Sequence, residues 1–141
     1  MEYEKGRIFL LRVPEGEELV EYIKKFAEKK GIKMAVISAI GSLKRAKLGY
    51  FNIGWGRYEV FTATGIHELI AATGNISLKD GKPFPHIHAL LGEHDGSTVG
   101  GHLIEGDVFV AEVYIEELKG EPLERVPHGN LALWKAEDLS N

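Results

Sequence analysis

The sequence predicts an α+β fold with a mainly antiparallel β-sheet and a strand-helix-strand unit at its N-terminus. One segment, residues 15–30, has apolar residues at helical spacing. The segments after residue 41 are short, rich in β-forming residues and separated by glycines. A single helix near the start, followed by strands joined through turns, is the pattern of an α+β domain.

The opening unit is predicted to be a strand, a helix and a second strand. Residues 6–13 are rich in β-formers and end before a proline, so they form the first strand. In residues 15–30, glutamates gather at the start, lysines gather at the end, and Gly31 follows as the C-cap. The apolar positions of this helix are Leu19, Tyr22, Ile23 and Phe26. Residues 32–40 form a nearly continuous apolar run, which predicts a central strand closed by Gly41 and Ser42.

The middle and the end of the chain are predicted to be strands. Residues 46–51, 57–62 and 66–77 are short β-type runs. Residues 107–118 alternate well enough for one long strand. In the tail, residues 131–134 form either a last strand or a packing segment, and His128, after a proline, is placed in a loop.

Residues 83–104 are predicted to form a β-hairpin. His94, Asp95 and Gly96 suit a three-residue loop in which the glycine takes the left-handed position. Glu93 then faces Ser97, and counting back along both strands sets the register of the hairpin.

This register brings three histidines together. His88 faces His102 and His86 faces Ile104, so His86, His88 and His102 share one face. Three imidazoles and an open position are the ligand set of a catalytic zinc site. The alternatives are ordinary hydrogen-bonded histidines on a strand face, or a two-residue turn that moves His102 to the other face, opposite Ala89.

Length and composition fit one globular domain over residues 1–141, with 44% hydrophobic and 27% charged residues. The absence of cysteine leaves His, Asp and Glu as metal ligands. A net charge of −4 gives no global attraction to nucleic acid. The N-terminus lacks signal-peptide features and no apolar run approaches the length of a membrane span, so a cytoplasmic protein without membrane contact is expected.

The ordered motifs resemble the PPC (plants and prokaryotes conserved) domain family in its stand-alone prokaryotic form. They are Ile40-Gly41-Ser42, Gly65 through Ile70 followed by Gly74, Pro85-His86-Ile87-His88, and Gly100-Gly101-His102-Leu103 followed by Gly106. The resemblance implies an α+β fold, a homotrimer, fold-level kinship with acetolactate decarboxylase and its histidine-held zinc, and a metal site at His86, His88 and His102. The chain has no AT-hook, and residues 65–70 lack the Arg and Phe of the plant hexapeptide Gly-Arg-Phe-Glu-Ile-Leu.

The first functional hypothesis is therefore a zinc-site protein, for example a small-molecule lyase or hydrolase. The metal would lower the pKa of a bound water or polarise a substrate carbonyl. Glu68 is the candidate catalytic acid or base, and its alternative is a surface carboxylate. A structural metal site with every position filled is a further possibility.

The second hypothesis is a DNA-associated trimer. Lys44, Arg45 and Lys47 give three positive charges in four residues, in a predicted loop after Gly41-Ser42. The alternative is a solvated basic loop, since no base-reading helix accompanies the cluster. His67, His94 and His128 are not assigned to the metal site.

Overall fold

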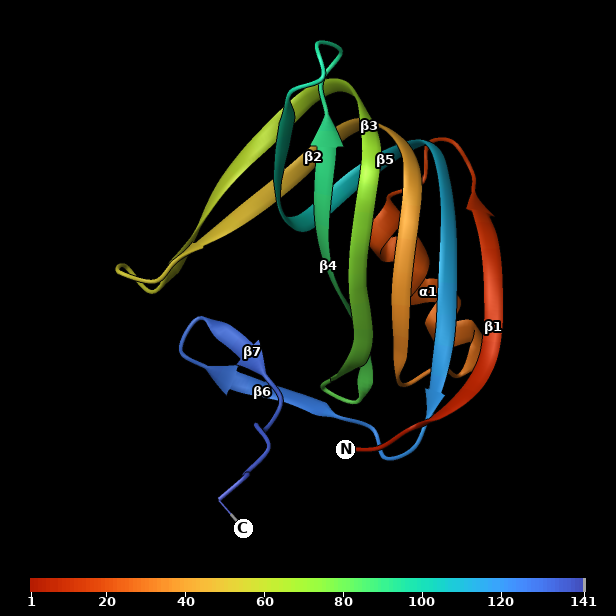
Figure 1. The fold of residues 1–141 in the computed structure, drawn as a ribbon, viewed down its shortest axis with the longest axis vertical. Coiled ribbons are helices and arrows are strands. Elements are labelled where there is room, and N and C mark those ends of the chain that lie inside the picture. The colour runs from red at the N-terminus through yellow and green to blue at the C-terminus, as the bar shows by residue number, and fades with distance from the viewer. Residues whose placement is uncertain (141) are drawn as a thin grey trace.

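The computed structural model describes residues 1–140 and has one helix beside a twisted sheet (Figure 1). The elements are β1 (Glu4–Val13), α1 (Leu19–Lys30), β2 (Ala35–Asn52), β3 (Arg57–Lys79), β4 (Lys82–Gly92), β5 (Thr98–Lys119), β6 (Glu124–His128) and β7 (Leu131–Leu133). The strand order is β1-β5-β2-β3-β6-β7, and β4 pairs with both β3 and β5. All pairings are antiparallel except β3 with β6. The predicted α+β class and the strand-helix-strand start are confirmed.

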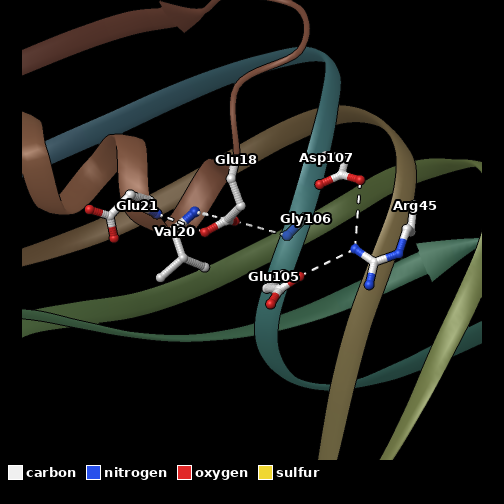
Figure 2. Close-up of polar contacts among 7 residues, drawn as sticks. All are labelled: Glu18, Val20, Glu21, Arg45, Glu105, Gly106 and Asp107. Atoms are coloured by element: carbon white, nitrogen blue, oxygen red, sulfur yellow. Dashed lines mark hydrogen bonds and ion pairs between the residues drawn. The ribbon is translucent and has the colours of Figure 1, made fainter.

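The helix begins at Leu19, four residues later than predicted, because Glu18 is its N-cap. The Glu18 carboxylate accepts hydrogen bonds from the Val20 and Glu21 amides at 2.8 and 3.0 Å. It also accepts one from the Gly106 amide of β5 at 2.9 Å, as Figure 2 shows. One carboxylate thus satisfies free N–H groups of the first turn and fixes the helix to the sheet. Gly31 ends the helix in the left-handed conformation, as predicted, with φ 68°.

The strands are longer than the sequence indicated. β2 continues through Gly41 and Ser42, where a strand end was expected, and β3 joins two runs that were predicted to be separate. Gly41 is required by close packing and not by a turn, since a Cβ there would lie 2.0 Å from the Val110 carbonyl oxygen. The β2–β3 ladder continues past Gly41, with a register shift between Ala39 and Gly41.

The C-terminal tail contains one strand that the sequence analysis missed. Residues 124–128 form β6, so His128 ends a strand and does not lie in a loop. β6 was overlooked because it contains a proline, which argues against a strand. β7 confirms the predicted last strand within residues 131–134. Among residues 1–140, no helix has the length and apolar character needed to cross a membrane.

The two faces of the sheet differ. Helix α1 and the inward residues of the strands form the core, with Leu19, Ile23 and Ile37 among its buried members. Cross-strand partners share a face, so the exposed Val36 of β2 lies on the same side as its partner Asn75 of β3, and Asn75 on the same side as its partner His86 of β4. The first of the candidate histidines therefore lies on the face opposite α1.

Candidate metal centre

The hairpin register is the predicted one. His88 of β4 pairs with His102 of β5, and Gly92 pairs with Thr98. The Glu93 amide donates to the Ser97 carbonyl at 2.8 Å, and Gly96 has φ 88°. The three-residue loop is therefore confirmed and the two-residue alternative is wrong.

One predicted pairing within the hairpin is wrong. The β4–β5 ladder ends at His88 and His102, so His86 does not face Ile104. Beyond His102, strand β5 leaves β4 and continues as a partner of β2. His86 pairs instead with Asn75 of β3.

The three histidines nevertheless converge. Their ring centroids lie 5.1 Å (His86–His88), 5.4 Å (His86–His102) and 5.8 Å (His88–His102) apart. One ring nitrogen from each lies within 4.8 Å of the others. His86 and His102 are partly buried and His88 is exposed, so the cluster is open on one side. The arrangement can hold a metal ion while leaving a position accessible to another ligand.

The electrostatics favour neutral imidazoles. Burial lowers the pKa of His86 to about 4, with Arg125, His102 and His88 adding to the effect. Burial also lowers the pKa of His102, together with His88 and Arg125. Both rings are therefore uncharged at pH 7 and each keeps one lone pair for a metal.

His102 also carries an unsatisfied polar atom. Its Nδ1 is buried and has no hydrogen-bond partner within residues 1–140. Such an atom costs free energy unless something pairs with it. A divalent cation among the three rings fits this donor set, since neutral imidazole nitrogens are preferred ligands of zinc and related ions.

Glu68 does not join this cluster. It pairs with Gly92, four residues along β4 from His88, which is roughly 13 Å of strand. Its carboxylate lies 3.3 Å from the Ser42 hydroxyl in an exposed position. The catalytic role of Glu68 remains a prediction.

His67 has a separate local role. Its side chain is buried, with Nδ1 3.0 Å from the Gly65 carbonyl and Nε2 2.9 Å from Glu93. The Gly65 hydrogen bond raises the pKa of His67, and Glu93 raises it further. The pair ties β3 to the start of the hairpin loop. His94 lies in that loop, as predicted.

Arg125 of β6 is the residue near the histidines that sequence reasoning missed. It is 7% exposed and donates to the Ser77 hydroxyl at 2.7 Å, to the Ala132 carbonyl at 3.1 Å and to the Asn75 side chain at 3.1 Å. Its Nη2 also lies 3.4 Å from His86 Nδ1. Arg125, His86 and His102 border one pocket of about 200 Å³. Nothing in the local sequence signals this position, because it depends on β6 pairing with β3 far away in the chain.

The basic cluster lies in strand β2 and not in a loop. Lys44 forms an ion pair with Glu15 at 2.8 Å. Arg45 lies between Glu105 at 3.3 Å and Asp107 at 3.6 Å, as Figure 2 shows. The predicted loop is wrong, because β2 continues past Gly41-Ser42. Acidic neighbours also pair with two of the three cations.

Fold and site together define a class of small α+β proteins in which a hairpin of an antiparallel sheet carries a three-histidine cluster. Residues 1–119 match the Plants and Prokaryotes Conserved (PCC) domain, and the chain belongs to this family, which confirms the predicted PPC relationship. A plant- and prokaryote-conserved protein of Pyrococcus horikoshii is 52% identical, with TM-score 0.95 over 98% of this chain and 97% of that one.

Other proteins that are similar to this chain carry different descriptions. A metal-containing protein of Archaeoglobus fulgidus is 43% identical, with TM-score 0.90 over 96% of this chain and 97% of that one. A Bacteroides thetaiotaomicron protein, described as a candidate DNA-binding protein, is 25% identical, with TM-score 0.84 over 94% and 96% of the two chains. The bifunctional protein GlmU of a Synechococcus strain is 30% identical over 101 residues, which are 71% of this chain and 15% of that protein.

Proposed function

We propose that this protein binds one zinc ion per chain through His86, His88 and His102. The observation that carries the proposal is the convergence of three ring nitrogens within 4.8 Å of one another. The buried, unpartnered Nδ1 of His102 supports it, because a metal bound at that nitrogen would satisfy the group. The A. fulgidus protein, which is described as metal-containing, supports a bound metal in this chain. Zinc is the favoured ion because its catalytic sites commonly use three protein ligands and an open position.

A small molecule is the proposed partner of the bound zinc. When bound, zinc would supply Lewis-acid chemistry suited to a lyase or hydrolase, by polarising a carbonyl or acidifying water. The chain itself contributes neutral histidines and a pocket of about 200 Å³ beside them. Glu68 is retained as the proposed acid or base, a role that requires its strand to move so that the carboxylate comes within hydrogen-bond reach of the bound ligand.

The alternative is a structural zinc with no open position. The exposure of His88 favours an accessible site over a closed one. Cobalt-substituted protein separates the two, because the visible spectrum of an open site changes when azide is added and that of a filled site does not.

We test the proposal by elemental analysis of untagged protein purified without added metal, beside the His102→Ala variant. The expected result is about one zinc per wild-type chain and none in the variant. Wild-type protein that is metal-free and also fails to bind added Zn²⁺ would overturn the proposal. A different metal at the same stoichiometry would overturn the choice of zinc but would be consistent with the three-histidine site.

We also propose a cytoplasmic homotrimer of one domain spanning residues 1–141. Large apolar side chains lie exposed on the sheet face opposite α1, including Leu10 at 79% and Ile40 at 53%. Figure 1 shows the paired ends of β2 and β3 projecting from the sheet, and Ile53 and Trp55 in their connection are 90% and 64% exposed. Such patches mark interaction sites. Light scattering should give three times the 15.6 kDa chain mass, and a monomer in solution would contradict the assembly.

DNA association by such a trimer is the weaker candidate function. The B. thetaiotaomicron structure supports it by its description. The ion pairs of Lys44 and Arg45 and the net charge of −4 count against it. Duplex binding that is strong at low salt and falls steeply as salt rises would favour this candidate.

A further inference from the structure

We propose that the pocket beside the three histidines binds a small organic carboxylate, with Arg125 as its principal partner. This inference rests on the proposed function, because it names the class of ligand that the zinc site would take. Arg125 carries a permanent positive charge. Within residues 1–140 this buried guanidinium forms no salt bridge, and its partners are the neutral Ser77, Asn75 and Ala132. Buried charges are normally paired, so the site lacks an anion.

The guanidinium of Arg125 is held in a fixed position beside the pocket. Three hydrogen bonds of 2.7 to 3.1 Å fix it in place. The rings of Trp134 and Phe84 lie against it, with centroids 4.4 and 5.3 Å from the guanidinium carbon. A guanidinium has five N–H donors, so these bonds leave donors unused. A rigid arginine with free donors is well suited to bind a planar carboxylate through two parallel hydrogen bonds.

Metal binding would free a further donor. Arg125 Nη2 points at His86 Nδ1 from 3.4 Å, a contact that needs the lone pair of that nitrogen. A neutral imidazole has one lone pair, on one nitrogen or the other. If the metal takes Nδ1, the arginine loses its acceptor, and if the metal takes Nε2, then Nδ1 carries the proton and cannot accept. Zinc ligation by His86 and this arginine contact therefore exclude each other, and loading the site releases an N–H group beside the metal.

The pocket favours an organic ligand of a few carbon atoms. Its charged lining groups are two cations, Arg125 and the exposed Lys79, and its lining includes no acidic residue. Leu131, Leu133 and Phe84 supply apolar walls. A volume of about 200 Å³ is smaller than that of pockets for drug-sized molecules. A carboxylate with a short carbon chain matches both the cationic groups and the apolar walls.

The test is calorimetric titration of zinc-loaded protein with L-lactate and propanoate, beside the neutral lactamide and propanamide and beside inorganic phosphate. The carboxylates are expected to bind and the amides not to bind. Arg125→Gln should abolish carboxylate binding. Arg125→Lys keeps the charge but cannot donate two parallel hydrogen bonds, so it should weaken carboxylate binding about tenfold. Lys79→Gln should weaken binding less, and the distant helix variant Lys25→Gln should leave it unchanged.

The zinc content of each sample is measured as well, so that failure of the zinc proposal can be distinguished from failure of the carboxylate proposal. Zinc binding without carboxylate binding would overturn the carboxylate site alone. Arg125-dependent lactate binding by a protein that takes no zinc would overturn the metal proposal alone. Equal binding of lactate and lactamide, wild-type binding by a folded Arg125→Gln variant, or tighter binding of phosphate would each overturn the carboxylate assignment.

Discussion

Zinc is expected to raise the free energy of unfolding of the wild-type protein by about 2.7 kcal/mol when free zinc is about 100 times its Kd, and to leave the His88→Ala variant unchanged. A ligand that binds the folded state and not the unfolded chain stabilises the fold by mass action. The three histidines converge only when β4 and β5 pair, so the unfolded chain has no preformed site. Urea unfolding in zinc-buffered and zinc-free solution measures the difference.

His88 is the informative position because its side chain is exposed. Its replacement by alanine removes a ligand without opening a cavity, so the zinc-free stability of the variant should match that of the wild type. His94→Ala is the matched control, since His94 lies exposed in the hairpin loop outside the cluster. It should keep the full response to zinc. Undiminished stabilisation of His88→Ala would show that zinc binds elsewhere.

The sequence was sufficient to predict the histidine cluster because that part of the fold is local. A three-residue loop with glycine at its left-handed position sets the register of a hairpin, and strand alternation then decides which side chains share a face. His88 and His102 face each other for this reason. The exact neighbours of His86 were not predictable, because they depend on where β5 leaves β4 for β2.

Arg125 could not be predicted for a related reason. Its place beside His86 follows from a short parallel pairing between β6 and β3, in which Lys79 aligns with Arg125 across 46 positions of sequence. No local periodicity encodes such a long-range pairing. The place of Glu68 also depends on long-range pairing: the register of β3, with a shift between Leu69 and Ala71, separates it from the histidine cluster.

The prediction of a turn at Gly96 in the hairpin loop is correct, and the prediction that Gly41 closes a strand is wrong. A glycine in a strand ends the strand, makes a bulge or allows another backbone to approach closely, and composition does not separate these cases. At Gly41 the structure shows close approach to Val110 of β5. At Gly74 it shows the same relation to His86, which links a backbone position in β3 to the histidine cluster.

Gly74→Ala is therefore expected to cost on the order of 3 kcal/mol of stability and to weaken zinc binding by about 10- to 100-fold. A Cβ at this position would lie 1.9 Å from the His86 carbonyl oxygen and 2.9 Å from the Ile87 Cα. Both neighbours are backbone atoms of β4, so no side-chain rotation relieves the overlap. The β3–β4 ladder has to open beside His86, which moves one ligand relative to the other two. Chemical denaturation and competitive zinc titration measure the two effects.

Gly54→Ala is the matched control for this substitution. Its Cβ would meet the Asn52 side chain at 3.4 Å, an ordinary contact at an exposed position in the β2–β3 connection. Its stability should stay within about 0.5 kcal/mol of the wild type and its zinc affinity should be unchanged. If Gly74→Ala matched this control in both measurements, β4 would have to be free to shift without disturbing His86. If it lost stability but kept full zinc affinity, the ligand geometry would be set by β5 and the loop, and not by the β3–β4 ladder.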